Sequence, residues 1–237
     1  MSTSEIMGFN PGGWGADMLA AAGMTLAVAA AGFLSGIVLG FAGAAAKLSR
    51  FRVLRLLADA YTTLFRGVPD LLIIYLFYFG SSSLIGSVAG AFGARGFVGA
   101  PAFLTGSVAL GVVSGAYETE VFRGACLALH KGEVEAARAI GMGPFLAFRR
   151  IILPQAARFA LPGLDNVWQL VLKQSALISV IGLVELMRQA QVGAGSTRQP
   201  FTFYLAAGAL YLLITSLSSL VFHRAERRAA RGIRRAL

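Results

Sequence analysis

Residues 131–154 read KGEVEAARAIGMGPFLAFRRIILP and form a patterned hydrophilic stretch inside a strongly apolar chain. The pattern is Glu135-Ala136-Ala137, then three residues, Gly141, nine residues, and finally Ile151, Leu153 and Pro154. It predicts a short helix that ends at Gly141 and a second helix that starts at Pro144, since proline is tolerated in a first helical turn. Pro154 is expected to end the second helix. A structured loop between apolar segments indicates a contact outside the membrane.

The composition is that of a membrane protein. Hydrophobic residues make up 57% of the chain and charged residues 14%, against about 25% charged residues in soluble domains. The mean hydropathy is +0.71. The apolar runs approach the roughly 20 residues that cross a bilayer as a helix. We therefore expect an all-α membrane protein, one transmembrane domain over residues 1–237, with five spans at about 18–46, 54–79 (interrupted at 66–69), 101–117, 161–184 and 201–222.

The basic residues alternate between the loops of these spans. The N-terminal tail has none, the loops have five, one, six and two, and the C-terminal tail has six. Because cytoplasmic loops are enriched in Lys and Arg, this alternation predicts a periplasmic N-terminus and a cytoplasmic C-terminus. The net charge of +10 then reflects topology and requires no nucleic-acid partner. We expect no cleaved signal peptide, since the N-terminal tail lacks a cationic start.

Residues for cofactor or redox chemistry are scarce. Cys126 is the single cysteine, and His130 and His223 have no neighbouring ligand residues, so no metal site is expected. No GxxxxGK[ST] loop is present. If ATP drives this protein, ATP and Mg²⁺ bind another chain.

The hydrophilic loop allows two interpretations from its residues alone. Phe145, Phe148, Ile151 and Ile152 follow a helical spacing beside two arginines, which suits a helix lying on the inner leaflet. Small residues and the helix break at Gly141 suit insertion into a cleft of another protein.

The loop resembles the EAA loop of permease subunits of bacterial ABC importers. All defining positions of that motif are present, namely Glu135, Ala136, Ala137, Gly141, Ile151, Leu153 and Pro154. In that family the loop forms the coupling helix that docks in a groove of the ATPase. The resemblance therefore implies an ATPase-coupling role for these residues.

Further segments resemble the polar amino-acid branch of this family. They are Arg66-Gly67-Val68-Pro69, Ala116-Tyr117 with Glu120 and Arg123-Gly124, and Leu172-Lys173 with Ser175-Ala176-Leu177. Within the branch the chain most resembles permeases for histidine, for lysine, arginine and ornithine, and for the opines octopine and nopaline. The resemblance implies an inner-membrane subunit that imports polar amino acids of the basic or opine type. Its implied partners are an ATPase dimer, a second related permease, a periplasmic binding protein and membrane lipid.

Four polar residues are candidates for the substrate pathway: Glu120, Asn166, Gln169 and Lys173. A carboxylate at membrane depth usually faces a cavity or a partner, so Glu120 either balances the charge of an amino acid or pairs with Arg123. Lys173 either meets a substrate carboxylate or an acid, Asp165 or Glu120, or serves helix packing. Asn166 and Gln169 either bind a polar ligand or hydrogen-bond between helices.

Two other features keep alternatives open, and a third predicts helix packing. Glu118 departs from the apolar residue usual in the family, and it either tunes the site or faces solvent. Arg66 and Asp70 flank the helix break and mark either a cavity or a capping pair. Gly32, Gly36 and Gly40 predict close helix packing.

The competing functions are a self-contained secondary transporter or channel, and a membrane enzyme. The first predicts transport without ATP, and five spans without an inverted repeat disfavour it. The second requires a catalytic cluster that the sequence lacks.

Overall fold

The computed structural model describes residues 7–10, 12–91 and 99–230. In this part of the chain 86% of the residues are helical and none is in a β-strand. Arg95 and the arginines after Ala230, counted above for topology, lie outside the described residues. The elements are α2 (Gly15–Lys47), α3 (Arg52–Gly67), α4 (Asp70–Ala91), α5 (Ala102–Leu127), α6 (Lys131–Ala139), α7 (Pro144–Ala147), η1 (Phe148–Ile152), α8 (Leu153–Ser175), η2 (Ala176–Ile181), α9 (Leu186–Thr197) and α10 (Pro200–Ala229).

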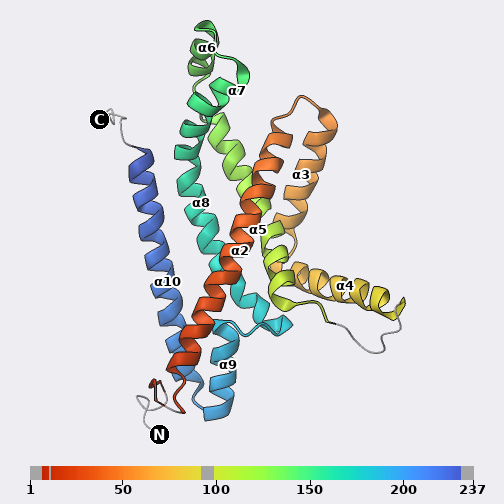
Figure 1. Ribbon diagram of the computed structural model, residues 1–237, viewed down its shortest axis with the longest axis vertical. Helices are drawn as coiled ribbons and strands as arrows, with labels where there is room; N and C mark the ends of the chain where they lie inside the picture. The colour runs from red at the N-terminus through yellow and green to blue at the C-terminus, as the bar shows by residue number, and fades with distance from the viewer. Residues whose placement is uncertain (1–6, 11, 92–98, 231–237) are drawn as a thin grey trace.

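The pair α2 and α5 forms the centre of the bundle (Figure 1). A Cβ atom added at Gly32 would lie 2.7 Å from Leu110 Cβ, and one at Gly40 would lie 2.6 Å from Glu118 Cβ. The two backbones therefore approach as closely as glycine alone permits. This confirms the close packing predicted from the spacing of the glycines.

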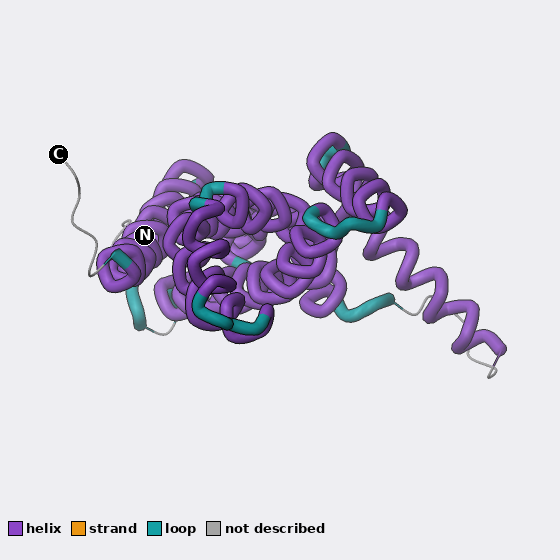
Figure 2. Tube along the Cα trace, turned by 90° about the horizontal axis from the view of Figure 1, so that it is seen from above, coloured by secondary structure: helices purple, strands orange, loops and turns teal. Residues whose placement is uncertain are grey.

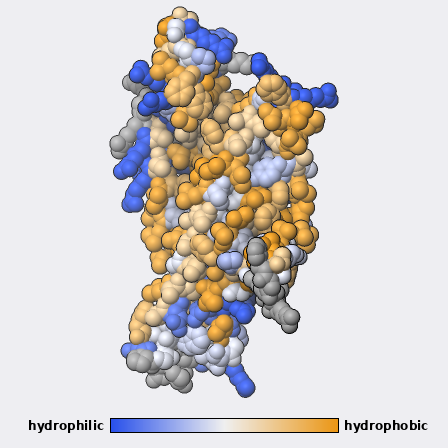
Figure 3. All heavy atoms as spheres, turned by 45° about the vertical axis from the view of Figure 1, so that its right-hand side comes forward, coloured by the Kyte–Doolittle hydropathy of each residue, from blue (hydrophilic) through white to orange (hydrophobic). Residues whose placement is uncertain are grey.

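Two ends of the molecule can be distinguished in Figure 1. The start of α2 and α9 lie at one end. The α6–α7 loop, the C-terminal end of α10 and the connection between α2 and α3 lie toward the other. Apolar side chains cover the region between the ends, and hydrophilic ones gather at both (Figure 3).

Among the residues that the structure describes, three helices are long and apolar enough to cross a membrane: α2, α4 as far as Val88, and α10. A fourth crossing results if residues 144–181 and α9, which are bent by 52°, count as one span. The helices also extend beyond the predicted spans. In particular, α5 continues ten residues past Tyr117 to Leu127, and α10 continues to Ala229.

The helix break predicted at residues 66–69 is present, but it separates two independent helices. Val68 is extended, with φ −92° and ψ 139°, as expected for a residue before proline. After the break α4 turns away from the bundle (Figures 1 and 2). It runs to Ala91, twelve residues beyond the predicted end of the second span at 79. Gln174 Nε2 donates a hydrogen bond of 2.7 Å to Asp70 Oδ2 and so fastens the start of α4 to α8.

Pro154 does not end the helix of the loop, contrary to the sequence prediction. The helix continues from α7 through η1, a π-helical turn at Phe148–Ile152, into α8. Proline lacks an N–H and crowds the carbonyl group one turn before it. A π-helical turn widens the backbone at this position and lets the helix continue.

The fourth predicted span, ending at 184, misses a bend. After η2, Gly182 adopts φ +92°, and α9 follows with Glu185 as its N-cap. Positive φ favours glycine, which explains the position of this turn. The helix α9 was not predicted as an element of its own.

Candidate functional site

The loop at the α6–α7 end has the shape that its sequence predicts. Helix α6 ends at Ala139, and Gly141 has φ +80°. Met142 N donates to Ala137 O at 3.0 Å, and Gly141 N donates to Arg138 O at 2.9 Å, so the last carbonyls of the helix are satisfied. Pro144 stands in the first turn of α7, as expected.

The two large apolar side chains near this turn do not pack on the protein. Ile140 is 73% exposed and Phe145 is 76% exposed. Glu135, Ala136 and Gly141 are also exposed, whereas Ala137 is 3% exposed. The exposed residues make a protruding surface with an apolar centre, of the kind that marks an interaction site. The second half of the motif lies elsewhere, with Ile151 in η1 and Leu153 and Pro154 at the start of α8.

A second site lies in the middle of the molecule, between α3, α5 and α8. Two adjoining hollows of about 500 and 510 Å³ share Arg66, Tyr117 and Glu120. We call them together the polar cleft. Asn166 and Lys173 line its α8 side, and Lys47 lines its outer part. The helix break after Arg66 helps to open this space, since it ends α3 beside α5.

Glu120 is neutralised within the protein. Its carboxylate pairs with Lys47 and, at 2.8 Å, with Arg123, and Lys47 also pairs with Asp59 at 2.8 Å. The pair with Arg123 was anticipated from the sequence, whereas Lys47 was not.

The other polar residues of the cleft have fewer partners. The Arg66 guanidinium lies 5.2 Å from the centre of the Tyr117 ring, a cation–π contact. Neither Arg66 nor Lys173 forms an ion pair with any residue that the structure describes, including Asp70, Asp165 and Glu120. The cleft therefore presents two uncompensated cationic groups.

Gln169 lies away from the cleft. Its amide donates to Asp165 Oδ1 at 3.3 Å and to Ser219 Oγ of α10 at 3.2 Å, so it links α8 to α10. It is not among the residues that line the cleft. Asn166, three residues earlier, is exposed on the cleft side.

Glu118 neither faces solvent nor lines the cleft, contrary to the two interpretations drawn from the sequence. Its side chain is fully buried against Gly36 and Gly40 of α2. Residues 117 and 120 point to the cleft, and 118 is rotated by about 100° from 117 on the helix. Both carboxyl oxygens are buried without a hydrogen-bond partner in the described structure.

Sequence reasoning missed a buried polar network at the α9 end. The Glu185 carboxylate accepts hydrogen bonds from Met187 N and Arg188 N, both at 2.9 Å, and from Tyr211 Oη at 3.1 Å. Thr25 Oγ1 lies 3.3 Å from Glu185 Oε2 and accepts from Leu186 N at 3.0 Å. An acid within an apolar segment could have drawn attention to Glu185. The network joins α2, α9 and α10.

No group of three or more His, Cys, Asp or Glu side chains in the described residues could hold a metal ion. The features with functional character are therefore a protruding loop at one end and a polar cleft between helices.

This combination is that of a membrane component of a transport system, and comparison with known proteins gives its family. Residues 32–231 match the binding-protein-dependent transport system inner membrane component, and the chain belongs to this family. It is a multi-pass inner-membrane permease subunit of an ABC importer, and ATP hydrolysis takes place on a separate ATPase chain.

Individual relatives agree with this assignment. The octopine transport system permease protein OccQ of Rhizobium radiobacter is 67% identical over 235 residues, which cover 99% of each chain. The histidine/lysine/arginine/ornithine permease HisQ of Escherichia coli is 39% identical over 224 residues, 94% of this chain and 98% of its own. A crystal structure of an amino acid ABC transporter with histidines matches with a TM-score of 0.74 and 34% identity, covering 89% of this chain and 93% of that chain. The resemblance to opine and basic amino-acid permeases is confirmed.

Proposed function

We propose that the chain crosses the inner membrane five times, with a periplasmic N-terminus and a cytoplasmic C-terminus. The α3–α4 pair supplies the second crossing, α5 the third, and α8 the fourth. Support comes from the arrangement in Figure 1, where the EAA loop and the end of α10 share one end of the molecule. Most basic residues belong to segments at this end, as expected for a cytoplasmic side.

The EAA loop is the surface that docks the ATPase. The observation that carries this proposal is the exposure of Ile140 and Phe145 beside the turn at Gly141. These apolar groups need a partner surface, and α6 is short enough to enter a groove. Within the motif, Glu135, Ala136, Ala137 and Gly141 shape the docking knob, while Ile151, Leu153 and Pro154 join it to α8. Movement of the ATPase is thereby transmitted to the α8 wall of the polar cleft.

The polar cleft is the substrate pathway, and its charge favours carboxylates. Since Glu120 is held by two cations, its charge is largely used within the protein. Arg66 and Lys173 approach from different helices and are available to the carboxylate of an amino acid. Asn166 adds an amide that can bond a polar substrate. Opines carry a second carboxylate, so two cationic groups suit them, in line with the similarity to OccQ.

The transporter contains two permease subunits, with a related permease completing the cleft, and two ATPase subunits. A periplasmic binding protein delivers the substrate. ATP and Mg²⁺ bind the ATPases, whose closure draws the coupling loops together and opens the pathway outward. Hydrolysis resets it.

The test is co-purification of the chain with the ATPase of its transport system. Gly141→Arg places a bulky charge on a residue with φ +80° and open space around it, so docking should be lost while insertion persists. Gly124→Arg is the matched control, because Gly124 is exposed on α5 with no atom within 4 Å of an added Cβ.

The expected result is retention of the ATPase by the wild type and Gly124→Arg, and loss with Gly141→Arg. Equal retention by all three folded proteins would contradict docking through the loop. Transport without an ATPase would instead support a self-contained secondary transporter or channel.

A further inference from the structure

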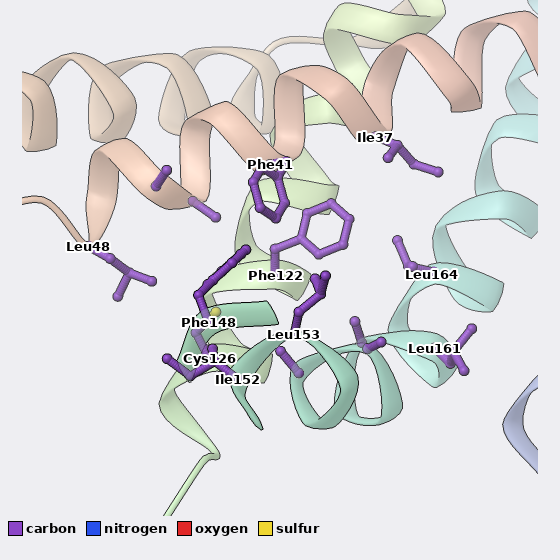
Figure 4. Close-up of a pocket in the computed structure, with 15 residues that line it drawn as sticks. Ile37, Phe41, Leu48, Phe122, Cys126, Phe148, Ile152, Leu153, Leu161 and Leu164 are labelled. Atoms are coloured by element: carbon purple, nitrogen blue, oxygen red, sulfur yellow. The ribbon is translucent and has the colours of Figure 1, made fainter. Parts of the chain in front are cut away.

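A deep apolar groove lies on the side of the molecule away from the polar cleft. Its volume is about 370 Å³, and its walls come from α2, α5, η1 and the first turns of α8. Apart from Cys126, every residue that lines it is a hydrocarbon or aromatic one. Figure 4 shows Phe41, Phe122 and Phe148 from three elements converging on it. The Phe41 ring centre lies 6.0 Å from that of Phe122 and 6.5 Å from that of Phe148.

Water is not expected to occupy this groove, because its lining is apolar. A buried water needs two to four polar partners, and the lining offers almost none. An empty space of this size would forfeit the dispersion contacts of its walls. Phe41 and Leu153 on its rim remain 47% and 43% exposed, so the groove communicates with the surroundings of the helices. In a membrane-spanning chain these surroundings are the hydrocarbon tails of lipids.

The groove continues toward the EAA loop into a second hollow of about 510 Å³. The two spaces share Leu48, Cys126, Phe148 and Ile152, and the second adds Glu135 and Arg138. Apolar walls thus give way to charged groups at one end only. A phospholipid has the same arrangement, with an apolar acyl chain at one end and a charged headgroup at the other.

The charge at this mouth favours an anionic headgroup. Arg138 forms no ion pair within the described residues, and Arg149 and Arg150 are exposed on the adjoining η1. Against these three guanidinium groups stand the two carboxylates of α6, Glu133 and Glu135; of these five side chains, Arg138 and Glu135 line the hollow itself. Basic pockets between helices on the cytoplasmic side attract the phosphates of anionic lipids. A guanidinium can bind a phosphate through two parallel hydrogen bonds.

We infer that one anionic phospholipid of the inner leaflet binds here, with an acyl chain in the Phe41–Phe122–Phe148 groove and its phosphate at Arg138. The choice of leaflet rests on the proposed orientation of the chain. The groove lies directly under the EAA loop, and η1 forms part of its wall. The lipid therefore fills the space between α2 and the helix that connects the loop to the membrane domain.

The test uses the full chain, purified in mild detergent, stripped of lipid and examined by native mass spectrometry. The probes are phosphatidylglycerol, phosphatidylcholine with the same acyl chains, and free oleic acid. We expect one phosphatidylglycerol per chain at saturation, with phosphatidylcholine and oleic acid binding more weakly. Labelling of Cys126, the single cysteine, by a thiol reagent should slow when phosphatidylglycerol is present.

Two alanines of α2 provide a matched pair of variants. Ala45 lines the groove, whereas Ala42 is exposed outside it. Ala45→Phe should weaken phosphatidylglycerol binding at least about tenfold, which corresponds to excluding two methylene groups from the groove, and Ala42→Phe should not. Ala157→Leu, on the α8 wall, is the second variant if Ala45→Phe does not fold. Arg138→Gln should reduce the preference for phosphatidylglycerol over phosphatidylcholine.

Three results would overturn the inference. The first is equal affinity of Ala45→Phe and Ala42→Phe for phosphatidylglycerol, and the second is equal affinity of the wild type for phosphatidylglycerol and oleic acid. The third is displacement of the lipid when the ATPase docks. The first two results are measured without the ATPase, so failure of this inference can be distinguished from failure of the proposed function.

Discussion

Replacing Glu185 by alanine should destabilise the end of the molecule where α2, α9 and α10 meet. The carboxylate is fully buried and accepts from two backbone N–H groups in the first turn of α9 and from the Tyr211 hydroxyl. Thr25 also contacts this carboxylate, but its hydroxyl keeps a hydrogen bond of 3.1 Å to Ala21 O, so the substitution affects it less than Tyr211. Alanine removes both carboxylate oxygens at once, whereas Leu186 N keeps Thr25 Oγ1 as its acceptor.

The cost follows from these contacts. Loss of a helix cap costs about 1 kcal/mol. The partly buried hydroxyl of Tyr211, left without its acceptor, costs about 1–2 kcal/mol, and the deleted methylene contributes about 0.8 kcal/mol. The sum is about 3–4 kcal/mol, equivalent to a change of roughly 100- to 1,000-fold in the unfolding equilibrium.

The free energy of unfolding in detergent, followed by circular dichroism during titration with a denaturing detergent, measures this effect. Glu185→Gln is the matched control, since glutamine keeps the length and one acceptor oxygen, and it should lose only about 1 kcal/mol. Tyr211→Phe should cost about 0.6 kcal/mol, the mean for such bonds between membrane helices. A Glu185→Ala protein within about 0.5 kcal/mol of the wild type would refute the reasoning, because that is the range of neutral surface changes.

Two glycine pairs give further predictions. Gly40→Ala should destabilise the protein by about 1–3 kcal/mol, because the added Cβ meets Glu118 at 2.6 Å, whereas Gly23→Ala on the same helix has open space and should be neutral or slightly stabilising. Thermal unfolding of the two proteins checks this, and equal melting temperatures would contradict the close α2–α5 contact. Gly141→Ala should strain the EAA turn by about 1 kcal/mol and weaken ATPase retention, whereas Gly143→Ala, at φ −64°, should not. Equal retention by these two variants would show that the turn conformation is unimportant for docking.

Local patterns predicted the local structure well. The turn at Gly141, the restart at Pro144, the helix break before Pro69 and the close packing at Gly32 and Gly40 depend on backbone properties of glycine and proline. These properties act within a few residues and do not need the rest of the chain. Pro154 is the exception, because the π-helical turn that accommodates it forms in a continuous helix packed against α2 and α5.

The polar residues were harder to predict, because sequence spacing does not specify what stands opposite a side chain. Glu118 and Glu120 are two residues apart, yet one is buried against α2 and the other is paired with Lys47 beside the cleft. Gln169 and Asn166 were equivalent candidates for the substrate pathway. In the structure Gln169 donates a hydrogen bond to Ser219 of α10, whereas Asn166 lines the polar cleft. Glu120 lies 73 positions from its partner Lys47, and Thr25 lies 160 positions from its partner Glu185.

The membrane class, the alternation of basic loops and the family-defining EAA loop could therefore be predicted from the residues alone, because they depend on composition, charge and short-range spacing. Which polar groups meet, where the polar cleft and the apolar groove lie, and how α9 is held to α2 and α10 became known from the folded chain. Such contacts depend on the packing of helices distant in sequence, and a rotation of one residue on a helix turns a side chain by about 100°.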